Sequence, residues 1–191
     1  MRSFDVVELA KAVAMTAHAG QVDKSGEPYI GHPARVAHAT AQETENPEVI
    51  AAAYLHDVVE DTPVDLTDLM RMGFPAETVK VVDLLTRRDH ESHAEAVQRA
   101  AEHPGARLVK LCDVEDNSDP RRLERLDERT RARLHRKYIK ARTVLLAHAV
   151  PPNPPPAPPR PAPTYETVEK GGTVVEASRS IRERIFGRAS R

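Results

Sequence analysis

The stretch that decides the fold is AAAYLHDVVEDTP, residues 51–63, in which an apolar segment runs directly into charged residues. Residues 51–55 suit a protein interior, and burying unpaired charge beside them costs free energy. Four titratable residues follow: His56, Asp57, Glu60 and Asp61. Two explanations are open. Either this helix end is solvated, or a metal ion turns the carboxylates and the imidazole into ligands.

Helical geometry places these four groups close together. Asn46 and Pro47 predict the start of a helix, and Thr62 before Pro63 predicts its end near Asp61. On such a helix the adjacent His-Asp pair is about 100° apart, and the Glu-Asp pair lies one turn further on. The pattern HDxxED is short and arises by chance fairly often. Alone it does not decide between the two explanations.

The apolar spacing is helical in the rest of the domain as well. The other predicted helices span residues 6–17, 33–41, 65–72, 75–85, 92–102, 106–116 and 128–148. The alternation that is typical of strands is almost absent, and the chain has no internal repeat. The sequence therefore predicts an all-α helical bundle.

The composition excludes several classes of protein. The chain has 191 residues, which is room for one domain with an appendage. Charged residues make up 30% but nearly cancel to a net charge of −1, so no overall field favours nucleic acid or a membrane. The single cysteine excludes an internal disulfide framework, and the N-terminal residues show neither a signal peptide nor a membrane span. We expect a cytoplasmic protein.

The composition changes sharply after residue 149. Residues 150–163 hold more than half of the chain's 16 prolines, a density that favours extended polyproline II over helix or sheet. We therefore expect a domain over residues 1–149, a proline-rich linker over 150–163, and a mostly disordered tail over 164–191. The basic tail could dock a protein partner.

Two further segments place an ionisable residue at the edge of an apolar run. His32 stands in PYIGHP, and Asp113 follows apolar residues in ARLVKLCDVEDN. With His56 and Asp57 they make a set of two imidazoles and two carboxylates. Such a set suits Mn²⁺ or Fe²⁺, with Mg²⁺ and Zn²⁺ as alternatives. A metal that prefers six ligands would keep positions for water and a phosphate oxygen.

These motifs resemble a known family. The order AHAGQ, KSGEPYIGHP, HDVVEDT, VKLCDVEDN is similar to that of the HD-domain hydrolases of the RelA/SpoT type, including the small alarmone hydrolases. The resemblance covers residues 5–148. It implies that members of this kind remove the 3′-pyrophosphate from guanosine tetra- and pentaphosphate, and the chain would be a stand-alone hydrolase.

The resemblance also implies roles for individual residues. The metal ion, typically Mn²⁺, would be held by His32, His56, Asp57 and Asp113. Glu60 and Asp61 would position and activate the attacking water. A metal can lower the pKa of bound water from 15.7 to about 7, which makes a nucleophile available at neutral pH.

The chain departs from the family at two places. The family commonly has an Arg-Lys pair before the SGEPY loop, where this chain has Asp23 and Lys24. Lys24 is expected to bind a substrate phosphate, whereas Asp23 would repel one. Asn117 matches the family and is expected to contact the substrate, but the acids Glu115 and Asp116 precede it. Together the acids predict a more acidic pocket, so a less charged nucleotide competes as substrate.

Two other functions compete with hydrolysis of guanosine tetraphosphate. One is an HD-superfamily phosphatase that acts on another nucleotide, and the other is a non-catalytic module that senses a nucleotide. The pair Glu60 and Asp61 favours an enzyme, because a sensor needs no acid that activates water. Among the remaining residues, we expect Tyr29 to pack beside His32 and His93 to be solvated.

Overall fold

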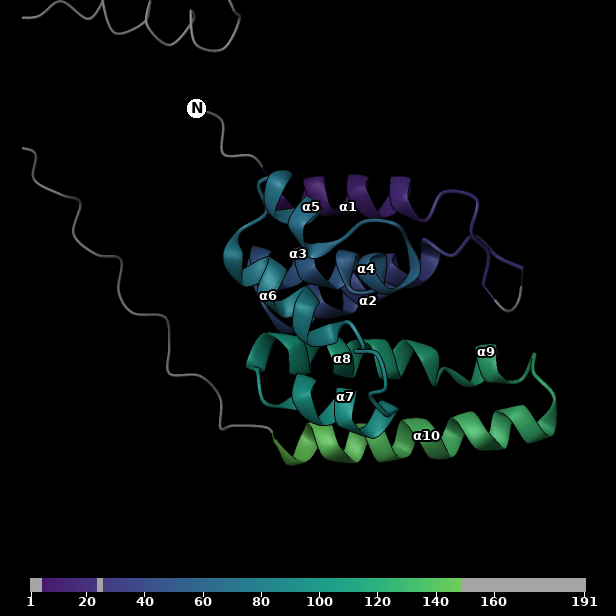
Figure 1. Ribbon diagram of the computed structural model, residues 1–191. Helices are drawn as coiled ribbons and strands as arrows, with labels where there is room; N and C mark the ends of the chain where they lie inside the picture. The colour runs from purple at the N-terminus through teal and green to yellow at the C-terminus, as the bar shows by residue number, and fades with distance from the viewer. Residues whose placement is uncertain (1–4, 24–25, 149–191) are drawn as a thin grey trace, which may run out of the picture. The chain divides into compact units, whose positions relative to one another are not determined.

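The computed structural model describes residues 5–23 and 26–148, which are helical apart from loops and one isolated antiparallel bridge between Val22 and Pro28 (Figure 1). In chain order the helices are α1 (Val6–Ala17), α2 (Gly31–Glu43), α3 (Pro47–Leu55), α4 (Val58–Asp61), α5 (Leu66–Arg71), α6 (Ala76–Leu85), α7 (His93–Ala101), α8 (Pro104–Asn117), α9 (Pro120–Leu123) and α10 (Glu128–Ala147). The predicted all-α class is confirmed, and no strand occurs in these residues.

Helix α3 lies at the centre of the larger hydrophobic core. It packs against α1, α2, α6 and α8, and its alanines at 51–53 are fully buried. Short side chains let the neighbouring helices approach closely, as dense core packing requires. The helix starts as predicted, with Pro47 in its first turn and the Asn46 side chain accepting a hydrogen bond from the Glu48 amide at 3.0 Å. The apolar half of the quoted stretch thus forms the middle of the bundle.

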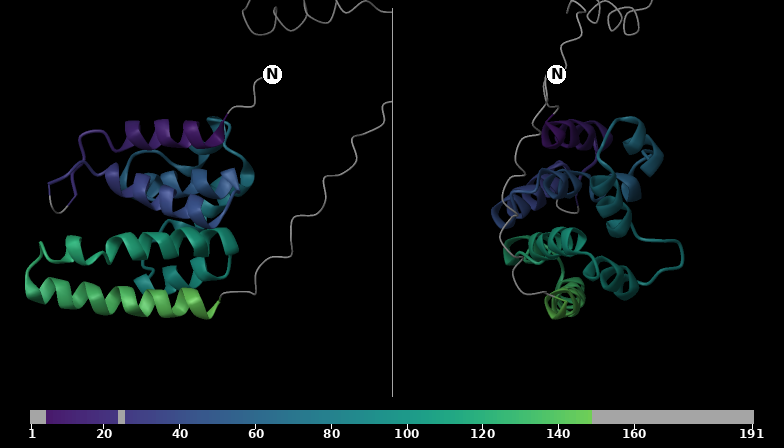
Figure 2. Two further views of the ribbon diagram at one scale, coloured as in Figure 1. Left: turned by 180° about the vertical axis from the view of Figure 1, so that it is seen from behind. Right: turned by 90° about the vertical axis from the view of Figure 1, so that its left-hand side faces the viewer.

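Helix α8 is shared by two hydrophobic cores. Val109 and Cys112 belong to the larger core, whereas Val114 belongs to a smaller core that α8 forms with α7 and α10. Figure 2 shows α7, α8 and α10 as a layer beside the helices that precede them. Asp113 therefore stands where the two cores meet.

The predicted helix over residues 47–61 is broken at His56 and Asp57, which lie between α3 and α4. The Nδ1 atom of His56 is 2.8 Å from the carbonyl oxygen of Ala53. This side-chain hydrogen bond competes with the backbone amide that would continue the helix, which is a recognised cause of breaks. The His-Asp pair consequently occupies a turn, and the predicted projection along one continuous helix is wrong.

Most other predicted helices occur with shifted ends. The helix predicted from residue 33 begins at Gly31, and the one predicted from residue 106 begins at Pro104. The short helix α9 lies in a charged run where the sequence predicts no separate helix. These shifts leave the predicted order of long helices unchanged.

Several predictions fall on residues outside the described ranges. The linker over residues 150–163, the tail over 164–191 and the substrate contact Lys24 all lie there. The domain boundary therefore stays a prediction. Among the described helices, none is both long and apolar enough to cross a membrane.

Candidate metal centre

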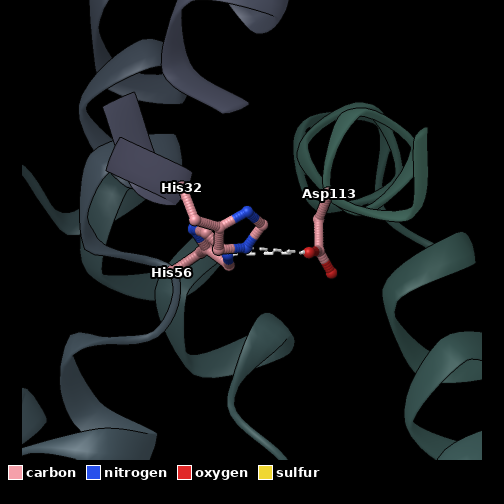
Figure 3. A group of neighbouring side chains, drawn as sticks. All are labelled: His32, His56 and Asp113. Carbon is pink, nitrogen blue, oxygen red and sulfur yellow. Dashed lines mark ion pairs between the residues drawn. The ribbon is translucent and has the colours of Figure 1, made fainter. Parts of the chain in front are cut away.

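Side chains from three parts of the fold meet at one buried point (Figure 3). His32 comes from the first turn of α2, His56 follows the last residue of α3, and Asp113 comes from α8. One ligand atom from each lies within 4.8 Å of the other two, and all three residues are buried. The Oδ1 atom of Asp113 is 3.2 Å from Nε2 of His32 and 3.8 Å from Nε2 of His56.

Asp57 adds a second carboxylate to this group. Its Oδ2 atom is 3.0 Å from Nε2 of His56 and 3.6 Å from Nε2 of His32. The structure therefore brings all four predicted metal ligands together, from segments up to 81 positions apart (113 − 32 = 81).

Hydrogen bonds on the far side of each imidazole determine which nitrogen faces the carboxylates. The Nδ1 atom of His56 contacts the Ala53 carbonyl, so it must donate its proton there. The Nδ1 atom of His32 lies 2.8 Å from Oδ2 of Asp116, which is again an acceptor. Both rings thus turn Nε2 toward Asp57 and Asp113, the orientation that a metal-binding histidine needs.

The charge and the buried polar atoms of the group fit a divalent cation. Nε2 of His56 is buried and makes no hydrogen bond. Burial lowers the pKa of His32, but its contacts with Asp113 and Asp116 raise it to about 9. Burial also raises the pKa of Asp113, yet Lys110 and His32 hold it well below its usual range. The ionised carboxylates thus demand positive charge, which a metal ion can supply.

The HD domain family matches residues 10–149 of this chain. The chain belongs to the HD-domain family. Membership implies a divalent metal ion, and the group of His32, His56 and Asp113 offers a buried position for one.

Curated relatives match part of this HD domain, and the matched part is a small share of each relative's own length. The GTP pyrophosphokinase of Streptomyces coelicolor is 37% identical over 116 residues, which is 56% of this chain and 14% of that protein. The guanosine-3′,5′-bis(diphosphate) 3′-pyrophosphohydrolase of Haemophilus influenzae is 43% identical over 77 residues, 40% of this chain and 11% of that protein. The bifunctional (p)ppGpp synthase/hydrolase SpoT of Escherichia coli is 37% identical over 94 residues, 49% and 13% respectively. The HD domain thus spans only a small part of each relative.

A solved structure shares the fold of this HD domain. It is described as a metazoan ortholog of SpoT that hydrolyzes ppGpp, and it matches with a TM-score of 0.65 and 24% sequence identity. The match covers 76% of this chain and 88% of that chain. Together with the curated relatives, it confirms the resemblance to HD-domain proteins of the RelA/SpoT type.

The two predicted catalytic acids lie on the short helix α4, which follows the predicted metal ligands His56 and Asp57. Oε2 of Glu60 accepts a hydrogen bond from the backbone amide of Arg87 at 3.1 Å, so the loop after α6 orients this carboxylate. Burial and the charge of Asp57 raise the pKa of Asp61. Glu60 is thus fixed by a neighbouring loop, while Asp61 is electrostatically coupled to a ligand.

Tyr29 links both parts of the site. Its ring packs against His32 as expected, with centroids 5.9 Å apart. Its hydroxyl also lies 2.6 Å from Oδ2 of Asp57 and 3.2 Å from Oδ2 of Asp61. These contacts join residues 28 and 32 positions apart, so no local pattern reveals them. The hydroxyl thus lies between a predicted metal ligand, Asp57, and a predicted catalytic acid, Asp61.

The predicted substrate contact Asn117 lies against a predicted metal ligand, Asp113. Its side-chain amide donates to Oδ1 of Asp113 at 2.5 Å, and the residue also lines the cavity of the HD domain. Asn117 therefore supports the orientation of Asp113 whether or not it touches a substrate. Its predicted partner in substrate binding, Lys24, is not among the described residues.

The acids that depart from the family pattern are paired with cations. Asp23 lies 3.6 Å from Arg122, and Asp116 forms ion pairs with both Arg35 and Arg122. Glu115 is 53% exposed and lies 3.7 Å from Arg142. The prediction that these acids make the pocket more acidic is therefore wrong, because arginines that are distant in the sequence offset the negative charge of the acids.

A cavity beside the predicted metal ligands is lined by residues of both charges. Its basic lining residues are Arg87, Lys110, Arg122, Arg125 and Lys137, and its acidic ones are Asp23, Asp57, Glu60 and Asp113. His93 also lines it and is not solvated as predicted: its Nε2 atom is buried without a hydrogen-bond partner. Burial and the nearby positive charge of Lys137 lower the pKa of His93 to about 4, so the ring is neutral at pH 7. The cavity suits an anionic ligand next to a metal ion.

Proposed function

We propose that this chain is a metal-dependent phosphohydrolase that removes the 3′-pyrophosphate of guanosine 3′,5′-bis(diphosphate) or of a related nucleotide. The observation that carries the proposal is the convergence of two imidazoles and two carboxylates beside a cavity to which five basic side chains contribute. The printed activities of the Haemophilus and Escherichia relatives support it, as does that of the solved metazoan ortholog.

In this proposal His32, His56, Asp57 and Asp113 hold one metal ion. Their mixed nitrogen and oxygen donors favour Mn²⁺, with Fe²⁺, Mg²⁺ and Zn²⁺ as alternatives. When bound, such an ion lowers the pKa of water and polarises a phosphoryl oxygen.

Glu60 and Asp61 handle the proton of the attacking water. The Glu60 carboxylate, held through Oε2 by the Arg87 amide, accepts the proton. Asp61 steers the water, and the hydroxyl of Tyr29 fixes Asp61 in relation to Asp57. The products are GDP or GTP and pyrophosphate.

Cations of the cavity wall hold the phosphates of the substrate. Lys110 lies 2.7 Å from Oδ2 of Asp113, so it stands next to the metal position. Lys137 and Arg87 line the same cavity and offer further positive charge to phosphate oxygens. Lys24 and Asn117 complete the proposed set of substrate contacts. A cytoplasmic location and a protein partner for the tail stay predictions.

Product analysis tests the proposed function. The purified protein is stripped of metal, supplied with Mn²⁺ and incubated with guanosine tetraphosphate beside a panel of nucleotides. Glu60→Gln serves as the inactive variant, and Glu8→Gln on the exposed face of α1 is the matched control. Pyrophosphate and GDP from the wild type and the control alone would support the proposal.

Other outcomes of this experiment select the competing functions. Cleavage of a different nucleotide would identify a phosphatase with another substrate. Binding of nucleotide without turnover would identify a sensor, and equal turnover by Glu60→Gln would remove the proposed role of Glu60.

A further inference from the structure

Asp116 lies where one imidazole and two guanidinium groups meet. Its Oδ2 atom is 2.8 Å from Nδ1 of His32. Arg35 donates to Oδ1 from Nε at 2.6 Å and to Oδ2 from Nη2 at 3.1 Å. Arg122 forms a further ion pair with the same carboxylate. The Asp116 side chain is only 12% exposed. A carboxylate that two guanidinium groups hold in a fixed geometry has little freedom to turn away from His32.

We propose that Asp116 is a positioning residue for His32. Its carboxylate keeps the proton of the imidazole on Nδ1 and the ring in the orientation that points Nε2 at Asp57 and Asp113. Asp116 acts on the proposed metal position through His32, and it also pairs with Arg122 of the cavity wall. This inference rests on the proposed function, in which His32 is a metal ligand.

The two histidines of the site are held in different ways. Nδ1 of His56 bonds to the Ala53 carbonyl, a backbone group that no side-chain substitution removes. Nδ1 of His32 depends on the Asp116 side chain, which comes from a position 84 residues away. Loss of the carboxylate behind a metal-binding histidine typically lowers metal affinity about 10–100-fold. A single substitution of Asp116 can therefore disturb the orientation of His32, whereas no side-chain substitution removes the partner of His56.

The neighbouring residue provides a matched control. Glu115 precedes Asp116 on α8 and carries the same charge, but it is exposed and pairs with Arg142 at 3.7 Å. Glu115→Ala thus removes an equal charge from the same helix without touching His32.

The experiment measures the affinity of the full chain for Mn²⁺ by competition with a chelator. Asp116→Ala is expected to bind Mn²⁺ about 10–100-fold more weakly than the wild type, and Asp116→Asn is expected to lie between them. Glu115→Ala should stay within about twofold of the wild type, because Glu115 is exposed and does not contact His32. Wild-type affinity in Asp116→Ala would overturn the inference.

A second measurement separates positioning from general damage to the fold. NMR of the histidine side chains in the Zn²⁺-bound protein reports whether each Nδ1 proton is hydrogen-bonded, from its chemical shift and its exchange with water. The wild type should show slowly exchanging, hydrogen-bonded Nδ1 protons on His32 and His56, and Asp116→Ala should lose the hydrogen-bonded signal of His32 while His56 keeps its own. A fall in affinity with an unchanged His32 signal would assign the effect to folding and overturn the inference.

The outcomes distinguish this inference from the proposed function. If the wild type binds no divalent metal, both are wrong. If the wild type binds Mn²⁺ and cleaves a nucleotide, but Asp116→Ala binds Mn²⁺ equally well, only the role of Asp116 is wrong. Asp113→Ala, which removes a ligand, marks the affinity expected when the site itself is lost.

Discussion

The hydroxyl of Tyr29 donates a hydrogen bond to Oδ2 of Asp57 over 2.6 Å, and this contact joins the loop before α2 to the break between α3 and α4. Burial and the charge of Asp57 raise the pKa of the tyrosine, so the hydroxyl keeps its proton at every pH of interest. It is a permanent donor to a residue proposed to bind the metal.

Tyr29→Phe should therefore weaken the site without unfolding the domain. A hydrogen bond to a charged group contributes about 1.5–3 kcal/mol, so metal affinity should fall about 10-fold or more. Metal titration and thermal unfolding check this. Tyr54→Phe, which removes a hydroxyl from a partly buried position of α3, is the control. Equal metal affinity in both variants would contradict the prediction.

Metal addition should stabilise the folded domain, because only the folded chain brings the ligands together. At a metal concentration 100 times Kd the gain is about 2.7 kcal/mol, which raises Tm by roughly 5–10 °C in a domain of this size. Differential scanning fluorimetry with and without a chelator measures the shift. Asp57→Ala should abolish both the shift and the activity, and a full shift in that variant would remove Asp57 from the ligand set.

The metal-free protein should lose stability as the pH rises. In the folded state the pKa of His32 is about 9, against 6.5 for an ordinary histidine. A group with a raised pKa contributes stability that is fully present below pH 6.5 and is lost as the pH rises through 9, on the order of 3 kcal/mol here. Thermal unfolding in chelator, from pH 6 to 9.5, measures the decline.

Two controls accompany the pH measurement. His32→Gln should flatten the decline, because the titrating ring is gone. Saturating metal should also remove it, since a metal binds the neutral imidazole and replaces the proton. If stability declines equally in the metal-free wild type, in His32→Gln and in the metal-saturated wild type, then groups other than His32 cause the decline.

Arg99 should be needed for the position of Glu60. Its guanidinium donates to the carbonyl oxygens of Asp83, Leu84 and Thr86, and it also pairs with Glu91 at 2.7 Å. Those contacts order the loop that orients Glu60. Arg99→Ala leaves the carbonyl oxygens without a partner, so we expect a loss of about 2 kcal/mol or more in stability and a lower kcat.

The control for Arg99 is an arginine in an exposed ion pair. Arg71→Ala removes a side chain that is 72% exposed and bonds to Asp68. Such pairs contribute at most about 1 kcal/mol, and kcat should not change. Chemical denaturation and turnover measure both variants, and an Arg99→Ala protein as stable and active as Arg71→Ala would refute the role of the loop.

A chain that ends at Val150 should keep the fold, the metal affinity and the activity, because all residues of the proposed site lie before residue 150. Its Tm should match that of the full chain. A chain that ends at Arg136 is the control, since it lacks the buried residues Ala141 and Leu145 of the smaller core and should unfold. Loss of activity at the longer truncation would move the predicted domain boundary.

The sequence predicted the candidate ligands and the class of the fold because both depend on local signals. His56 and Asp57 adjoin a run of small apolar residues, and Asp113 ends another apolar run, so their burial follows from periodicity. His32 is marked by the loop that precedes it. What periodicity could not show is the break of the helix at His56, because it depends on a hydrogen bond from the side chain.

The parts that the sequence could not predict are contacts between distant segments. Arg122 neutralises both Asp23 and Asp116, and only the fold brings α9 to the loop before α2. The same holds for Tyr29 and Asp57. His93 was placed in solvent because its neighbours are polar, yet it begins α7 on the side that faces the cavity. Charge in a sequence therefore indicates a site only after the partners of each charge are known.

The position of Asp113 between two cores has a mechanical consequence. The residues proposed to share one ion with it belong to α2 and to the turn after α3, and both α2 and α3 pack against α8. An ion bound there would cross-link the three helices, so any local separation of α8 from α2 and α3 would have to release the ion first. Metal binding would then slow amide hydrogen exchange in α2 and α8 together. The exchange rates of both helices would therefore measure whether the metal site is occupied.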